Sequence, residues 1–202
     1  MYCRGEDRRE DIVNNYTIKP IAHVKLVNGQ VKQSCTGDSL TDTYYCFSYE
    51  NNDGNDKGSF FCGNHAARDF LRLANLPPLP LFNPLSQAGN NGGGNDGGNN
   101  GQPAWDPLAK QLNEAINLLI VCWDVIPYGP LATIQSDLLR FPRSQPFVWK
   151  IKKVNHIISC DPQGRTLQDM VSELRTNNNI RQFSFDLLNQ ELSNINATSY
   201  FG

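Results

Sequence analysis

The sequence predicts an α+β protein made of two small domains joined by a flexible linker. Three observations lead to this prediction: strand-forming residues in the first half, a Gly/Asn-rich segment, and a long apolar helix pattern after it. Residues 86–102 contain seven Gly and five Asn and no apolar residue larger than Ala, so they cannot bury enough surface to become ordered. We therefore expect a small β-rich domain over residues 1–85, a linker over residues 86–103 and a helix-centred α+β domain over residues 104–202.

Composition narrows the class of protein. The chain has 202 residues and a net charge of −2, so any nucleic-acid-binding surface must be a local patch. The N-terminus is charged from residue 4 and lacks the apolar segment of a signal peptide, and no apolar run is long enough to cross a bilayer. We expect an intracellular, cytoplasmic protein, with a nuclear location also open, that has no membrane partner and whose six cysteines stay reduced.

Turn signals organise the first half. Residues 1–15 are polar and are predicted to be frayed or loosely docked. Asn28-Gly29 tolerates positive φ at both positions and predicts a hairpin that pairs residues 21–26 with residues 30–34.

A second hairpin and a helix follow. Residues 43–50 alternate between two faces and predict a strand, and residues 59–62 are its expected partner across a polar loop. From about Asn64 the apolar residues recur at helical spacing, so this hairpin leads into a helix.

The second half opens with clear helix signals. Asp106 is a predicted N-cap and Pro107 stands at the first helical position. Apolar residues then cover almost every side of the helix, which predicts the buried centre of this domain. A shorter helix is predicted from Pro130 to about Arg140.

The remainder of this half mixes strand and helix signals. Residues 147–160 are rich in β-branched and aromatic side chains, and their alternation changes phase midway, so we expect a strand with a bulge or turn. Thr166 and Asp169 form a predicted capping box at a helix start. A short strand over residues 180–185 and a last helix to about Asn194 complete the prediction.

The first half also carries a candidate structural zinc site. Zinc prefers four Cys or His ligands in a tetrahedron. The predicted hairpins and helix start supply four such ligands: Cys35, Cys46, Cys62 and His65. Cys3 or His23 is an alternative to Cys35. A domain of this size often needs a metal to supplement its core, although cysteines also serve as small buried apolar residues.

The segment Phe61-Cys62-Gly63-Asn64-His65 supports the zinc prediction. Residues 35–65 resemble Cys3His zinc modules that close with an aromatic-C-G-x-H segment. The resemblance implies a zinc-finger-like module in which the metal is structural.

A cysteine hydrolase is the alternative. The order Cys62, His156, Asp161 resembles papain-like peptidases and papain-fold toxins, whose nucleophile opens a helix and whose His and Asp come later in the chain. The resemblance implies a cysteine-dependent hydrolase or acyltransferase that uses these three residues.

Basic and aromatic residues alternate in the second half. The cations Arg140, Arg143, Lys150, Lys152 and Lys153 interleave with aromatic residues that include Trp149. Stacking rings beside cations suit single-stranded nucleic acid, whereas a solvated, lysine-protected edge strand has the same composition. Together these patterns predict an intracellular binding or adaptor protein with a structural zinc that contacts protein or single-stranded nucleic acid, rather than an enzyme.

Overall fold

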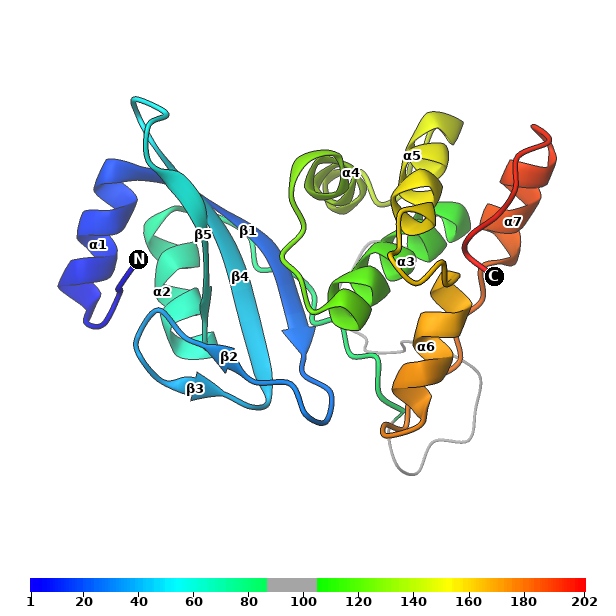
Figure 1. Cartoon of the computed structure of the whole chain (residues 1–202). Helices are drawn as coiled ribbons and strands as arrows, with labels where there is room; N and C mark the ends of the chain where they lie inside the picture. The colour runs from blue at the N-terminus through cyan, green and yellow to red at the C-terminus, as the bar shows by residue number, and fades with distance from the viewer. Residues whose placement is uncertain (87–104) are drawn as a thin grey trace. The chain divides into compact units, whose positions relative to one another are not determined.

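The computed structural model describes residues 1–86 and 105–202 and confirms the mixed α+β class (Figure 1). The described residues form two compact units. The N-terminal unit comprises Met1–Asn83 and Asp124–Pro127, and the C-terminal unit comprises Pro84–Trp123 and Tyr128–Gly202. All but residue 86 of the segment predicted as a linker lies outside the described residues, so the linker stays a prediction.

A three-stranded antiparallel sheet forms the centre of the N-terminal unit. Its order is β1 (Tyr16–Lys25), β4 (Thr43–Asn51) and β5 (Lys57–Cys62), which confirms the second predicted hairpin. Two short strands, β2 (Lys32–Gln33) and β3 (Ser39–Leu40), pair with each other.

The hairpin predicted around Asn28-Gly29 is wrong. Gly29 does adopt a positive φ of 87°, but the strand before it pairs with β4 instead of with the residues that follow the turn. β4 offers nine residues for pairing whereas β2 has two, so β1 forms many more hydrogen bonds and buries more side chains against β4.

The N-terminal residues are ordered, contrary to the prediction of a frayed segment. They form α1 (Glu6–Asn15), which begins after Gly5. Ile12 is buried, and the guanidinium of Arg9 lies 2.6 Å from the carboxylate of Asp69. These partners are far away in the sequence, so local composition did not reveal that α1 is docked.

Aromatic rings fill the core beneath the sheet. The predicted helix after the second hairpin is confirmed as α2 (Asn64–Leu73), and its Phe70 packs against Phe47 and Phe60 of the sheet. The centroids of these three rings lie 5.1 to 5.6 Å apart, in the range of favourable aromatic pairs.

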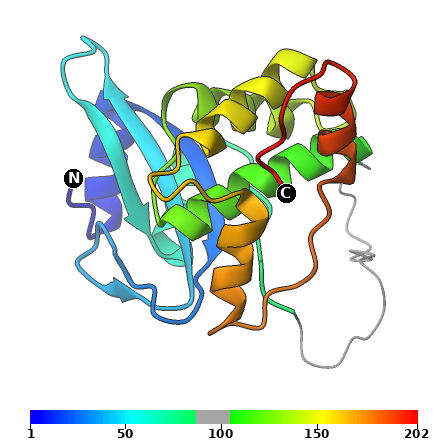
Figure 2. The same cartoon turned by 45° about the vertical axis from the view of Figure 1, so that its right-hand side comes forward.

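The C-terminal unit is built around α3 (Pro107–Trp123), as predicted (Figure 2). One carboxylate oxygen of Asp106 accepts hydrogen bonds from the backbone N–H groups of Leu108 and Ala109, both at 3.0 Å, and so caps the helix. α3 contacts each of the other four helices of its unit. Its apolar surface is therefore the core of the unit.

Three of those helices agree with the sequence prediction. They are α4 (Gly129–Arg140), α6 (Leu167–Arg175) and α7 (Asp186–Ser193). The capping box of Thr166 and Asp169 is present at the start of α6. The predicted strand over residues 180–185 is reduced to a single bridge between Leu85 and Ile180.

The largest correction concerns residues 147–160, which form α5 (Val148–Ser159) and not a strand. Ile151, Val154 and Ile158 are buried, and their spacing of three and four residues is that of one helix face. The apolar residues of this segment change parity midway because they follow the period of a helix, and that change had suggested a bulged strand. No helix in the two described parts of the chain has the length and apolarity needed to span a membrane.

Candidate functional site

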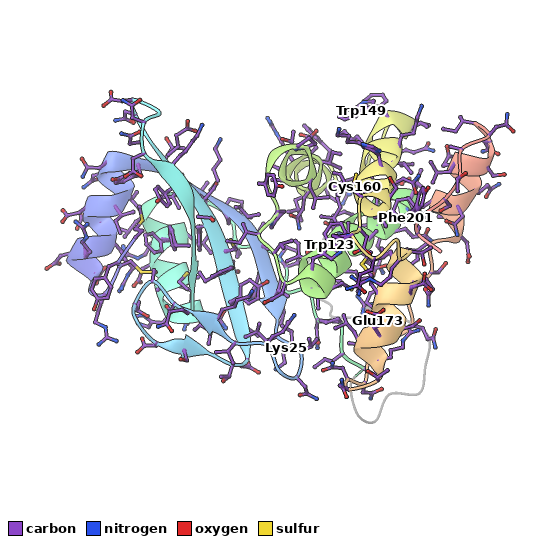
Figure 3. All side chains as sticks on the ribbon, viewed as in Figure 1. Lys25, Trp123, Trp149, Cys160, Glu173 and Phe201 are labelled. Carbon is purple, nitrogen blue, oxygen red and sulfur yellow. A yellow bond between two sulfur atoms is a disulfide. The ribbon has the colours of Figure 1, made fainter. Side chains whose placement is uncertain are left out.

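The outward face of α5 brings an aromatic ring and cations together. Because the apolar residues of α5 face the core, Trp149, Lys152, Lys153 and His156 follow one another along its exposed side. With Pro130 of α4, these four side chains line an open hollow of about 460 Å³. Figure 3 labels Trp149 near the N-terminal end of α5.

Large aromatic side chains are unusually exposed in this part of the C-terminal unit. Trp149 is 55% exposed, and Phe147, the N-cap residue of α5, is 71% exposed. Tyr128 and Phe141, which flank α4, are also exposed. These four exposed aromatic residues lie on or beside two successive helices, and Trp149 is the one among them that lines the hollow.

The charge of this surface is locally positive although the protein is slightly acidic. Residues 138–160 contain five Lys or Arg and no Asp or Glu. The ammonium group of Lys150 lies 2.8 Å from the carboxylate of Asp137 on α4, and its side chain is mostly buried. Lys150 therefore joins α4 to α5, whereas Lys152 and Lys153 are exposed and remain available to a ligand.

Apart from Lys150, which pairs with Asp137, the predicted nucleic-acid-binding residues fall into two groups. Trp149, Lys152 and Lys153 line the hollow, whereas Arg140 and Arg143 are exposed near the end of α4 and do not line it. Sequence reasoning missed His156 as a member of this surface. His156 follows Lys153 by three residues and Lys152 by four. This spacing places the three side chains on one face only if the segment is a helix, so the strand prediction concealed it.

The predicted zinc ligands do not come together. Cys35 forms a disulfide with Cys3, with a Cα–Cα distance of 5.3 Å, and His65 is on the surface with its side chain 84% exposed. Cys46 is opposite Phe61 in the β4–β5 pair, so Cys62 lies on the other face of the sheet.

Within residues 1–86 and 105–202, no group of three or more His, Cys, Asp or Glu side chains is placed to hold a metal ion. His23, the alternative ligand, stacks on Tyr45 and has Nδ1 3.2 Å from the carbonyl oxygen of Leu79. Zinc binding therefore stays a prediction that this geometry does not favour. The disulfide also corrects the expectation that all six cysteines are reduced.

The cysteine-hydrolase residues are not arranged for catalysis. Cys62 is fully buried, and burial raises the pKa of its thiol, so the reactive thiolate is scarce at neutral pH. The carboxylate of Asp161 accepts hydrogen bonds from Trp123, Arg165 and the backbone of Gln163. His156 is not among these partners, so the base–acid pair of a papain-like site is not formed.

Comparison with known proteins identifies a family but no described activity. No curated protein and no solved structure shows significant similarity to the chain. A family model described as "Uncharacterised conserved protein UCP028583" matches residues 1–200, so the chain belongs to that family.

Proposed function

We propose that the protein is a binding protein whose C-terminal unit holds single-stranded nucleic acid on the exposed face of α5. The observation that carries the proposal is the exposed side chain of Trp149 in one open hollow that Lys152 and Lys153 also line. Every nucleic-acid base has an aromatic face that stacks on such a ring, and lysines attract the phosphates.

The local positive charge supports this anionic ligand over a basic or neutral one. Residues 138–160 contain five cationic side chains and no carboxylate to neutralise them. The nearby carboxylate of Asp137 is already paired with Lys150. Trp149 and His156 are separated by about 10 Å along the helix axis at 1.5 Å per residue. This length gives room for a short stretch of backbone beside a stacked base.

Binding of fluorescently labelled oligo-dT and oligo-U to the full chain, followed by anisotropy at low and at physiological salt, tests the proposal. We expect saturable binding that weakens as salt rises, because phosphate contacts release counterions. Absence of binding at low salt would overturn it. The binding prediction would then be left with its other partner, a protein that contacts the same face of α5.

Two separate measurements address the zinc and hydrolase predictions. Metal analysis of the purified, reduced protein tests zinc, since Cys35 can bind metal only after its bond to Cys3 is broken. Alkylation of the native protein tests the enzyme. A catalytic Cys62 would react quickly, whereas a buried thiol with a raised pKa reacts slowly.

A further inference from the structure

We propose that the N-terminal unit binds a neutral saccharide in a polar hollow beside α1, a second site independent of the α5 surface. The hollow has a volume of about 420 Å³. Small-ligand pockets have volumes of roughly 300–1,000 Å³, so the hollow has room for one or two sugar rings. Its walls come from the end of α1 and from the residues at the start of the β4–β5 loop.

The floor of this hollow is held in place by contacts within the protein. Ile12 is buried, and the ring of Tyr16 packs edge-on against Tyr49 with centroids 5.6 Å apart. The hydroxyl of Tyr16 donates to the carboxylate of Asp56 at 2.8 Å, and the side-chain oxygen of Asn51 accepts from the backbone N–H of Asp56 at 3.0 Å. A ligand would therefore meet a surface that is already ordered, which reduces the entropy lost on binding.

The rim, in contrast, presents polar groups with unused hydrogen-bonding capacity. Asn52 and Asp53 are exposed, and in the described parts of the chain their side chains form no hydrogen bond with a protein group. The amide of Asn15 donates to the carbonyl oxygen of Asp11 at 2.7 Å, which leaves its own oxygen free to accept. These groups are available to hydroxyl groups of a ligand.

The chemistry of the lining favours a neutral ligand with several hydroxyl groups. Arg8 and Asp11 form an ion pair at 3.9 Å, so Asp53 leaves the lining slightly negative, which disfavours an anion. A sugar hydroxyl both donates and accepts a hydrogen bond. Carboxylate and amide side chains offer the matching pairs of acceptors and donors. Tyr16 and Ile12 also line the hollow and supply the apolar atoms that the C–H groups of a sugar would meet.

Nuclear magnetic resonance of the ¹⁵N-labelled full chain tests this site. The probes are glucose, galactose, mannose, N-acetylglucosamine, maltose and lactose. We expect at least one of them to shift the backbone amides of residues 8–16 and 51–53, with a Kd of about 1 mM or tighter. A panel in which no sugar shifts these amides would overturn the proposal.

Variants at the rim separate recognition from non-specific effects. Asn52→Ala and Asp53→Ala remove exposed side chains that fold stability does not require, and each should weaken binding about tenfold. Glu10→Ala, on the exposed surface of the same helix but outside the lining, should leave the Kd unchanged. If inorganic phosphate or spermidine produced the same shifts as the sugars, the hollow would recognise charge and the saccharide proposal would fail.

Discussion

Arg165 holds both carboxylate oxygens of Asp161, with Nη2 3.0 Å from Oδ1 and Nε 3.1 Å from Oδ2. The side chain of Asp161 is completely buried, and the indole N–H of Trp123 donates to Oδ1 at 3.0 Å. The remaining guanidinium nitrogen of Arg165, Nη1, lies 2.5 Å from the carboxylate of Glu173 on α6. This network joins the ends of α3 and α5 to both the start and the last turn of α6.

Asp161→Asn should destabilise the C-terminal unit by about 3 kcal/mol, because it leaves the guanidinium of Arg165 without its main partner. Urea unfolding followed by circular dichroism measures the change. Glu191→Gln, a carboxylate outside this network, should change the free energy of unfolding by less than about 0.5 kcal/mol. Equal effects of the two variants would show that the Asp161 network does not stabilise the fold.

Because of the same network, we expect the free energy of unfolding of the C-terminal unit to depend on pH in the acidic range. The hydrogen bonds from Arg165 hold the folded-state pKa of Asp161 well below its ordinary value. The contribution to stability is then fully present above the unfolded-state pKa of about 3.9 and is lost as the pH falls below it. The difference in unfolding free energy between the wild type and Asp161→Asn should therefore shrink as the pH is lowered from about 4 to about 2. A constant difference over this range would contradict the assignment.

The disulfide between Cys3 and Cys35 closes a loop with a sequence separation of 32 and ties the segment before α1 to the residues after β2. Replacing both cysteines by serine should lower the stability of the N-terminal unit by about 3.5 kcal/mol. Chemical denaturation of the wild type with and without reductant should show a similar difference. Cys160→Ser, at an exposed free cysteine, is the matched control and should have little effect.

Thiol counting checks the disulfide directly. The denatured, unreduced protein should have the four free cysteines Cys46, Cys62, Cys122 and Cys160, and reduction should expose two more. Six reactive thiols before reduction would mean that the bond is absent from the purified protein. That result would restore the expectation of a fully reduced intracellular chain.

Trp149→Ala should weaken binding of single-stranded oligonucleotides by about 1–3 kcal/mol, because the stacked base loses its aromatic partner. Anisotropy titration at one salt concentration measures this loss. Tyr2→Ala removes another exposed ring, in the N-terminal unit, and should leave the affinity unchanged. Equal losses in the two variants would argue against stacking on α5.

Lys152→Ala and Lys153→Ala should act through charge. Each should reduce the slope of log K against log salt by about 0.7, because a single-strand phosphate contact is lost. Lys19→Ala, an exposed lysine on β1, should not alter the slope. Unchanged slopes for both α5 variants would show that these lysines do not contact phosphate.

The sequence predicted which residue types make up much of the candidate site, but it did not predict how those residues are arranged in space. Trp149, Lys152 and Lys153 attract notice in the sequence because a ring and cations stand close together. The helical form of the segment places these three residues on one side with His156. It also directs Lys150 toward Asp137. β-branched side chains suit a strand in isolation, and only packing of Ile151 and its neighbours against the core selects the helix.

The sequence by itself determined the elements whose signals are local. The caps at Asp106 and Thr166 and the β4–β5 hairpin each depend on residues within one turn or one short loop of each other. The tertiary structure decided the docking of α1, the pairing of β1 with β4 and the bond between Cys3 and Cys35. Those features join residues tens of positions apart, and their free energy comes from burial and contacts that exist only once the chain has folded.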